Sequence, residues 1–306
     1  MNPMVTVILS VYNARPYLQE CIESVLNQSF KDFEFLIVDD GSTDGSWEVI
    51  RAYSDRRITS FQIQNSGVAR AKNFLIEKAR GTWIAVIDAD DVWHPLKLEI
   101  QTKFLKQNPK CILLGTFARV IDKDGNPLYV EPKVTDWPAI SRTIQIRNVF
   151  THSSVIYRLD AWKKAGGYNE SVHQYLADYE LMKALSQIGE VANVPVPLVL
   201  YRIVPHSVTT GFSISKKKVS SRIKKANYHY TLARICIFYI SRPKDFLLNV
   251  FQSILLNPLQ WKAYALLATG LVPPVALVVR KKILQREFFT YLSQLTEPED
   301  YLSTLS

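Results

Sequence analysis

The sequence is poor in cysteine, with only Cys21, Cys111 and Cys236 among its 306 residues, all far apart. An odd count without metal-site spacing argues against a disulfide framework and a zinc module, so we expect a reducing compartment. We expect no secretory leader, because the first apolar run, residues 5–9, is too short for one. Internal repeats and low-complexity tracts are also absent. We therefore expect a cytoplasmic globular protein.

Long hydrophobic runs are scarce as well. Residues 263–279 carry no charge, but Pro273-Pro274 interrupts them and three basic residues, 280–282, follow. The run is at the lower length limit of a membrane span. Three readings stay open: a buried helix pair, an interfacial hairpin anchored by the basic residues, and a true span, which is the least favoured. The net charge of +9 indicates an anionic partner: nucleic acid, an acidic membrane surface or a phosphorylated substrate.

The first hundred residues alternate between two hydrophobic periods. Continuous apolar runs predict strands at 5–11, 33–38, 58–63 and 83–87. Helical spacing of apolar residues predicts helices at 17–26, 47–53 and 68–79, and Pro95 is expected to open another. This alternation predicts an α/β fold with a mostly parallel central sheet flanked by helices.

The pattern changes after about residue 110. Two apolar runs around Asp124-Gly125-Asn126 predict a hairpin. A strand at 153–157 and helices at 161–164 and 177–188 are expected next. Because of Pro195 and Pro197, the run at 191–200 is at best an edge strand. After Ser207 the chain becomes basic and aromatic, and a helical extension is expected. We therefore divide the chain into residues 1–100, 101–207 and 208–306.

Polar clusters follow three of the predicted strands: Tyr12-Asn13, Asp39-Asp40 and Asp88-Ala89-Asp90-Asp91. In a parallel sheet these clusters meet at one rim, where ligands bind. Three carboxylates at one strand end repel one another, and a protein tolerates them where a cation binds. Mg²⁺ or Mn²⁺ shared between carboxylates and substrate phosphates fits this pattern. A solvated acidic turn capping the next helix is the alternative.

Taken together, these segments resemble the family 2 glycosyltransferases, which have the Rossmann-like GT-A fold. The matching segments are, in family order, VILSVYN (7–13), SVLNQSF (24–30), VDDGSTD (38–44), NSGVARAKN (65–73), DADD (88–91), GGYNE (166–170) and DYEL (178–181). Each motif alone is weak, but the ordered set is specific. The resemblance covers roughly residues 4–207 and implies an inverting transfer from a nucleotide diphosphate sugar.

The resemblance implies roles for the donor side. Tyr12 would stack on the nucleobase, where stacking contributes about 1–3 kcal/mol, unless it only packs the strand end. Asp40 would accept a hydrogen bond from the uracil imide, with Asp39 beside it, unless the pair only caps the turn at 41–42. Asp88 would contact the ribose hydroxyls. Lys72 stands where the family often has Arg, and would contact the base or the diphosphate; a solvated lysine on a helix face is the alternative.

The resemblance also implies a metal site. Asp90 would be the ligand of Mn²⁺ or Mg²⁺, and the metal would stabilise the departing diphosphate. Asp91 would assist at the metal or at the start of the next helix. Arg202 and His206 resemble a segment that folds over the diphosphate, although a histidine on a loop is more often a surface residue.

Asp178 is the expected general base, which removes the acceptor hydroxyl proton. It is also expected at a helix start, where it could be an N-cap. The family motif there is usually Glu-Asp, but this chain has Ala177-Asp178. His152 lies where the family's acceptor pocket begins, and Gly167 is assigned to acceptor binding with it; a satisfied, half-buried histidine is the alternative.

The resemblance implies UDP-sugars first, with GDP- or dTDP-sugars as alternatives, and a glycan or lipid-linked acceptor in cell-surface polysaccharide biosynthesis. The Gln-x-x-Arg-Trp signature of processive synthases is absent, so transfer of a single sugar is favoured. We expect no nucleic acid partner. The region 208–306 is expected to contact an anionic membrane, on the cytoplasmic face of the inner membrane, or another subunit.

Two other functions remain open. A sugar nucleotidyltransferase would share the fold class and the aspartate metal site. It usually has a Gly-rich basic loop after the first strand, where this chain has Ser10-Val11-Tyr12-Asn13. A catalytically inactive nucleotide- or glycan-binding module is suggested by Ala177.

Overall fold

A computed structural model describes residues 2–172, 174–204 and 297–305. These residues belong to one compact unit of the chain, which spans Met1–Thr209 and Leu295–Ser306. Residues 263–279, with their three alternative readings, lie outside the described residues, as does most of the expected C-terminal extension. Among the described helices, none is long and apolar enough to cross a membrane.

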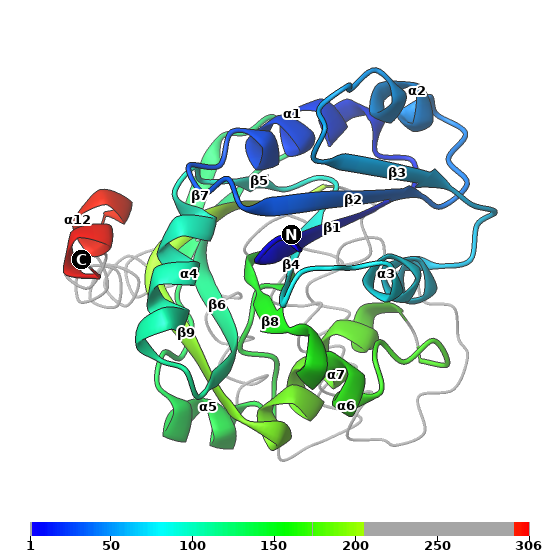
Figure 1. The fold of residues 1–306 in the computed structure, drawn as a ribbon. Coiled ribbons are helices and arrows are strands. Elements are labelled where there is room, and N and C mark those ends of the chain that lie inside the picture. The colour runs from blue at the N-terminus through cyan, green and yellow to red at the C-terminus, as the bar shows by residue number, and fades with distance from the viewer. Residues whose placement is uncertain (1, 173, 205–296, 306) are drawn as a thin grey trace, which may run out of the picture. The chain divides into compact units, whose positions relative to one another are not determined.

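The first half of the unit is a parallel sheet in the order β3-β2-β1-β4 (Figure 1). Its strands are β1 (Val5–Val11), β2 (Phe33–Asp39), β3 (Ile58–Gln62) and β4 (Trp83–Asp88). Val11 pairs with Asp39, and Ser10 pairs with Asp88. The carboxyl ends of β1, β2 and β4 are therefore level, and the predicted rim of polar clusters is confirmed.

The second half continues the same sheet with mixed pairing. Strand β8 (Ile156–Arg158) is antiparallel to β4 and to β6 (Cys111–Ile121), which forms the predicted hairpin with β7 (Pro127–Glu131). Strand β9 (Glu190–Arg202) lies parallel to β6, and β5 (Val92–Trp93) pairs antiparallel with β9. The expected α/β class is confirmed. Of the four parallel pairings among the described strands, three lie in the half that carries the acidic rim.

Strand β9 corrects the expectation of an edge strand. It pairs with β6 on one side and, at Val199 and Leu200, with β5 on the other. The two prolines are accommodated by a register shift, because Thr116 pairs with Val194 while Phe117 pairs with Pro197. An irregularity of this kind lets a residue without an N–H donor stand inside a ladder.

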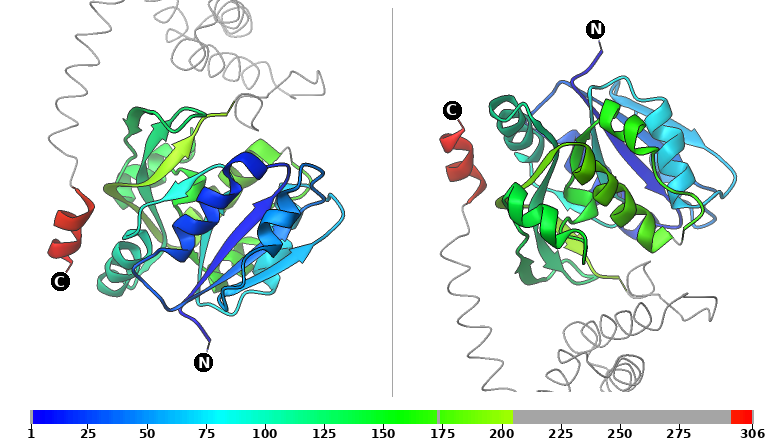
Figure 2. Two further views of the ribbon diagram at one scale, coloured as in Figure 1. Left: turned by 90° about the horizontal axis from the view of Figure 1, so that it is seen from above. Right: turned by 90° about the horizontal axis from the view of Figure 1, so that it is seen from below.

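Helices cover both faces of the sheet (Figure 2). One apolar cluster joins the strands to α1 (Arg15–Leu26), α2 (Ser46–Arg51) and α4 (Lys97–Gln107). The other joins them to α3 (Val68–Glu77), α5 (Trp137–Thr143), α6 (Leu159–Ala165) and α7 (Gln174–Ile188). Alternation along β1 produces the two layers, because Val7 and Leu9 belong to the first cluster and Ile8 to the second.

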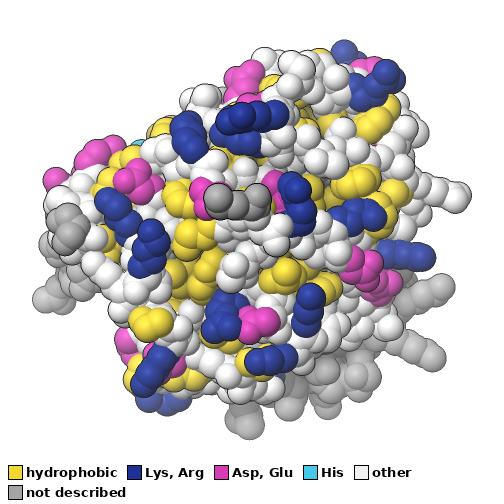
Figure 3. Space-filling view, in the orientation of Figure 1, with side chains coloured by type: hydrophobic (Ala, Val, Ile, Leu, Met, Phe, Trp, Pro, Cys, Tyr) yellow, Lys and Arg dark blue, Asp and Glu magenta, His cyan; other side chains and the backbone are white. Residues whose placement is uncertain are grey.

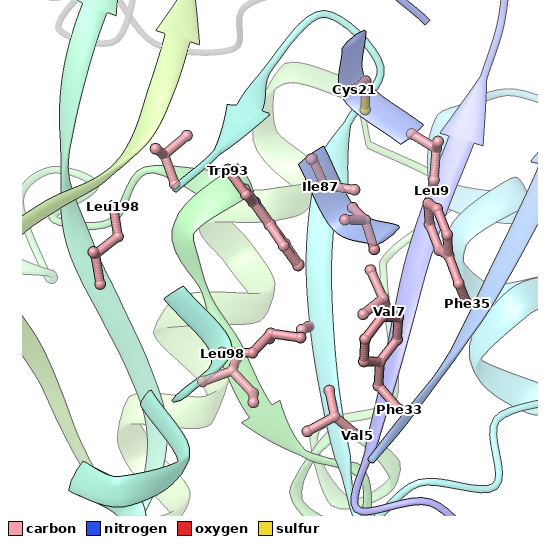
Figure 4. Packing of buried hydrophobic residues seen from close by; sticks show 14 of the residues in the cluster. Val5, Val7, Leu9, Cys21, Phe33, Phe35, Ile87, Trp93, Leu98 and Leu198 are labelled. Carbon is pink, nitrogen blue, oxygen red and sulfur yellow. The ribbon is translucent and has the colours of Figure 1, made fainter. Parts of the chain in front are cut away.

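The first cluster is closely packed (Figure 4). Phe33 and Phe35 of β2 lie beside Val5, Val7 and Leu9, and each of these side chains is at most 4% exposed. Burying an aliphatic or aromatic side chain of this size contributes about 1.5–3 kcal/mol. The strands that end at the rim are therefore fixed in place by a closely packed core.

Among the element boundaries that differ from expectation, three bear on the site. The strand expected at 153–157 starts at Ile156, and a 3-10 turn, η1 (His152–Ser154), precedes it. Helix α4 begins at Lys97, two residues after Pro95. Helix α7 begins at Gln174, which places Asp178 about one turn inside the helix and excludes its reading as an N-cap.

The described residues at the end of the chain belong to the same compact unit. Helix α12 (Pro298–Thr304) contributes Tyr301 and Leu302 to the edge of the first apolar cluster. The Nε2 atom of Gln107 in α4 donates to the carbonyl of Leu305 at 3.2 Å. In the space-filling view of the face that carries the N-terminus, Lys and Arg side chains are scattered among acidic and apolar ones and form no single patch (Figure 3).

Candidate active site

The turn after β1 presents an aromatic ring. Asn13 adopts φ 51°, in the left-handed region, and its backbone N–H donates to Ser42 Oγ at 3.0 Å. The side-chain oxygen of Asn13 accepts from the backbone N–H of Thr43 at 2.9 Å. Tyr12, just before this turn, is 56% exposed. Its ring is therefore accessible at the rim, as a stacking platform requires, and its contact with a base stays a prediction.

Asp39 and Asp40 hold the neighbouring loops. Asp40 accepts from the backbone N–H groups of Ser66 (2.8 Å) and Gly67 (2.9 Å), just before α3, and is 3% exposed. Asp39 is 0% exposed and accepts from the backbone N–H of Ser42 at 3.3 Å. The turn-capping alternative thus describes Asp39, whereas Asp40 holds the segment before α3. Nucleotide contact by either carboxylate stays a prediction.

Gly41 lets these two loops approach each other. It adopts φ +77°, and a Cβ atom at this position would lie 2.8 Å from the backbone nitrogen of Asn65. The Nδ2 atom of Asn65 donates to the carbonyl of Asp40 at 3.0 Å. A side chain at residue 41 would therefore separate the loops that the two aspartates hold together.

Four side chains from separate elements meet below the rim: Lys72 of α3, Asp88 of β4, His152 of η1 and Asp178 of α7. Lys72 Nζ lies 3.1 Å from Asp88 Oδ1 and 3.7 Å from Asp178 Oδ1. His152 Nδ1 lies 3.1 Å from Asp88 Oδ2, and its Nε2 lies 3.2 Å from Asp178 Oδ1. The lysine side chain is only 3% exposed, so its reading as a solvated surface residue is wrong.

The charges in this cluster stabilise one another. Burial would raise the pKa of Asp88, but the charges of Lys72 and His152 outweigh it and hold that pKa well below its usual range. Burial would lower the pKa of Lys72, yet Asp178 and Asp88 outweigh it and raise that pKa. Asp88 and the buried Lys72 thus form an ion pair, and both are charged at neutral pH.

The pKa values of Asp90 and Asp91 are raised, in contrast to that of Asp88. Burial and the charge of Asp88 raise the pKa of Asp90 to about 6. Burial and the charges of Asp90 and Asp88 raise the pKa of Asp91 well above its ordinary value. Asp91 Oδ1 accepts from the backbone N–H of Arg202 at 2.8 Å, whereas its buried Oδ2 has no hydrogen-bond partner. Crowded carboxylates with an unpartnered buried oxygen favour the arrival of a cation.

The donor set fits a divalent ion shared with a substrate, and not a site made by protein ligands alone. Across the described ranges, no group of three or more His, Cys, Asp or Glu residues is arranged to hold a metal ion. Mg²⁺ is commonly held by one or two carboxylates with substrate phosphates supplying further ligands. Asp90 and Asp91 match that smaller number, so a metal there depends on a bound phosphate.

Arg202 connects the acidic segment 88–91 to other residues near the rim. Its guanidinium donates to Glu20 Oε2 at 2.6 Å and to the Asp90 carbonyl at 2.9 Å, and lies 4.8 Å from the centre of the Tyr17 ring. With 3% of its side chain exposed, Arg202 is buried. These contacts occupy the arginine in holding the loop, and its contact with a diphosphate stays a prediction.

One contact was missed by the sequence interpretation. Asn73 donates from Nδ2 to the carbonyl of Tyr168 at 2.9 Å and accepts at Oδ1 from the N–H of the same residue, also at 2.9 Å. Gly167 adopts φ +74°, and a Cβ atom there would lie 3.2 Å from Asn73 Oδ1. The GGYNE segment is thus pinned to α3. The sequence did contain a signal for this contact, because Asn73 is the last residue of the family motif at 65–73.

Two cavities of the described residues lie outside the network of Lys72, Asp88, His152 and Asp178. A cavity of about 620 Å³ lies at the opposite edge of the sheet, where Lys31, Arg57 and Arg80 line it with Asp55. A second, of about 330 Å³, lies between Asn65, Ser66 and α3, on the loop that Asp40 holds. The candidate site is identified by its chemistry instead.

The structure brings together only part of the predicted set. Lys72, Asp88, His152 and Asp178 form one network, and Asp90 and Asp91 follow Asp88 directly. Tyr12, Asp39 and Asp40 lie on the same rim, but among the described residues no hydrogen bond or ion pair joins them to that network. His206 lies outside the described residues.

Comparison with known proteins gives the class. The model of glycosyl transferase family 2 matches residues 6–161. TuaG of Bacillus subtilis, a glycosyltransferase assigned to teichuronic acid biosynthesis, is 34% identical over 200 residues, or 57% of this chain and 79% of TuaG. The hyaluronan synthase of Pasteurella multocida is 29% identical over 228 residues, or 74% of this chain. This chain matches only 22% of that synthase and 32% of the Escherichia coli chondroitin synthase.

Solved structures agree on the fold. Staphylococcus aureus TarS in complex with UDP-GlcNAc has a TM-score of 0.57 at 18% identity, covering 83% of this chain and 73% of that one. The mannosyltransferase PcManGT of Pyrobaculum calidifontis, in complex with GDP-Man and Mn²⁺, has a TM-score of 0.52 at 19% identity, covering 100% and 86%. The family model gives a glycosyltransferase, and the fold is of the GT-A type. The chain belongs to glycosyl transferase family 2.

Proposed function

We propose that this protein transfers one sugar from a nucleotide diphosphate donor, with UDP-sugar as the first choice, to a hydroxyl of a glycan or lipid-linked acceptor. The reaction inverts the anomeric carbon and serves polysaccharide biosynthesis at the cytoplasmic side of a membrane. The names of its relatives support the pathway, since TuaG is assigned to teichuronic acid and others are hyaluronan and chondroitin synthases.

The observation that carries this proposal is the shared network of Asp88 and Asp178. A donor-side carboxylate and a second carboxylate from another element are held by the same lysine and histidine. An inverting transfer needs this separation of tasks, because the donor is bound on one side and the acceptor is deprotonated on the other. Asp178 is 26% exposed, so it can reach a substrate while remaining fixed.

Each step then has a group that performs it. Tyr12 stacks on the base, the loops held by Asp39 and Asp40 enclose it, and Asp88 faces the ribose. Asp178 takes the proton of the acceptor hydroxyl as that oxygen bonds to the anomeric carbon. The bond between that carbon and the diphosphate oxygen breaks, and the nucleoside diphosphate leaves. Asp90, with Asp91, would hold Mn²⁺ or Mg²⁺, which supplies neutralising charge to the leaving group.

Asp178→Asn tests the assignment of the base. The variant keeps the shape of the side chain but cannot take a proton, so we expect donor binding within about threefold of wild type and transfer reduced by about 10³-fold or more. Nucleoside diphosphate release is measured with Mn²⁺ and each of several nucleotide sugars. Glu180→Gln, which removes a carboxylate from the same helix, is the matched control. Near-normal transfer by Asp178→Asn would contradict the assignment.

The same assay separates the two other functions. Pyrophosphate exchange, in place of nucleoside diphosphate release, would indicate a sugar nucleotidyltransferase. Donor binding without turnover by the wild type, with every donor and acceptor tried, would indicate a binding module. The anomeric configuration of the product, read from its proton NMR couplings, tests inversion directly.

A further inference from the structure

Helix α4 begins with a lysine that is buried inside the protein. Lys97 is 0% exposed, and among the described residues no carboxylate forms an ion pair with it. Burial lowers the pKa of Lys97 well below its ordinary value. A methionine of similar length would fill the same space without the cost of taking an amine out of water. The nitrogen atom of Lys97 therefore has a role beyond packing.

This nitrogen contacts two side chains from different elements. Nζ donates to Oε1 of Gln101, one turn later in α4, at 2.8 Å. It also lies 3.8 Å from the centre of the Trp93 ring in β5, and an N–H group over an aromatic face is a weak attractive contact. Gln101 is 0% and Trp93 2% exposed, and Figure 4 shows the indole among apolar neighbours. Lys97 thus joins α4 to β5 inside the core.

The same two side chains hold the turn η1. Gln101 Nε2 donates to the carbonyl of Ser154 at 2.8 Å and to that of Leu114 at 3.1 Å. Trp93 Nε1 donates to the carbonyl of Ser153 at 2.8 Å. Because carbonyl groups can only accept, they must face Nε2 of the glutamine, and Oε1 is then left to face the lysine nitrogen. The partners therefore fix the direction of this amide.

The turn in its place holds a donor-side carboxylate. The hydroxyl of Ser153 accepts from the backbone N–H of Asp88 at 3.0 Å and donates to Asp88 Oδ2 at 3.2 Å. Ser153 is 0% exposed, so water does not compete for this hydroxyl. The carbonyl of the same serine is the one that Trp93 binds. A continuous line of contacts thus runs from Lys97 to Asp88.

We propose that Lys97 is a positioning residue of the donor site. Through Gln101 and Trp93 it fixes the carbonyl groups of residues 153 and 154, so that the Ser153 hydroxyl meets Asp88 in one orientation. The proposal rests on the proposed role of Asp88 in donor binding. It adds a residue that touches no substrate and that the sequence motifs did not single out.

Lys97→Met tests this role, because it keeps the length of the side chain and removes Nζ. We expect the donor KM to rise about fivefold to tenfold and kcat to stay within about threefold, since the contact that is loosened belongs to donor binding. Steady-state nucleoside diphosphate release with a UDP-sugar and Mn²⁺ measures both constants. Unchanged donor KM in a folded Lys97→Met protein would overturn the proposal.

A control variant comes from the same helix. Thr102 is 2% exposed, and its hydroxyl donates only to the carbonyls of Leu98 and Glu99 in α4 itself. Thr102→Val therefore removes a buried polar group that does not reach η1, and we expect its donor KM to stay within about twofold of wild type. An equal rise of KM in the control would show a general effect of disturbing α4, against the proposal.

A double variant tests whether Lys97 acts through Ser153. Ser153→Ala removes the hydroxyl that contacts Asp88 and should itself raise the donor KM. In that background Lys97→Met should change the donor KM by less than about twofold, because the end of the line of contacts is already lost. The same factor with and without the Ser153 hydroxyl would mean that Lys97 acts by another route, and the proposal would be wrong.

Trp93→Phe decides the matter should Lys97→Met fail to fold in urea denaturation. It keeps an aromatic ring and removes only the N–H that binds the Ser153 carbonyl, so the donor KM should rise about threefold or more; an unchanged KM would contradict the proposal. Failure of the proposed function looks different. In that case the wild type releases no nucleoside diphosphate, or Asp88→Ala keeps the donor KM, and the role of Lys97 falls with it.

Discussion

Replacing Asp90 by asparagine should make the metal-free protein more stable at neutral pH. Burial and the neighbouring charge of Asp88 raise the pKa of Asp90 to about 6, from an ordinary value of 3.8. Between these two values the native state holds a proton that the unfolded chain has lost, so the free energy of unfolding falls as pH rises through this window. A difference of about two units corresponds to about 3 kcal/mol. Asparagine carries no charge and avoids this penalty.

The assay is urea denaturation of wild type and Asp90→Asn after treatment with EDTA, at pH 4 and pH 7.5. We expect similar stabilities at pH 4, where the native carboxyl is protonated, and an advantage of about 2–3 kcal/mol for the variant at pH 7.5. Saturating Mn²⁺ with UDP should reverse the order, because only the wild type gains stability from the ion. Equal stabilities at both pH values would refute the electrostatic reasoning, and equal gains from Mn²⁺ would refute the metal assignment.

Three further predictions test how the site is held in place. Asn73→Ala removes both hydrogen bonds to the backbone of Tyr168, so we expect a loss of about 1–3 kcal/mol in chemical denaturation and a lower kcat; unchanged kcat and stability would contradict the pinning role. Gly41→Ala sets a Cβ atom 2.8 Å from the backbone of Asn65, and calorimetry should show a fall in unfolding free energy of about 1–3 kcal/mol, with weaker UDP binding; a stable variant would show that the loops can separate freely. Arg202→Gln should weaken Mn²⁺-dependent donor binding by about tenfold or more in titration calorimetry, because the guanidinium contacts with the Asp90 carbonyl and with Glu20 are lost. Unaltered binding would show that residues 88–91 keep their position without these contacts.

Much of the fold was predictable because its signals are local. The four parallel strands and the hairpin have apolar runs or turn residues that need no distant partner to be recognised. Strand β9 was misjudged because proline argues against an interior strand, and the register shift that accommodates Pro195 and Pro197 depends on its partner β6. The start of α7 was missed because its first turn, from Gln174, has no apolar periodicity of its own.

In the candidate site, too, features with local sequence signals were predictable and features that depend on distant partners were not. The ordered motifs predicted which residues gather at the rim, since each follows a recognisable strand or turn. The burial of Lys72 was not predictable, because its partner His152 lies 80 residues away and is brought to it only by the pairing of β4 with β8. The buried contacts of Arg202 likewise depend on Glu20, from a helix at the other end of the sequence.

The cross-link through Lys72 has a consequence for how substrates enter. Lys72 from the parallel half, whose side chain is 3% exposed, lies 3.7 Å from Asp178 Oδ1 of the mixed half, and Asn73 joins the same two halves one residue further along α3. Separating the two halves would take Asp178 away from the buried Lys72 and would break the hydrogen bonds between Asn73 and Tyr168, so this movement is unfavourable. We therefore expect the two halves of the sheet to stay together during turnover.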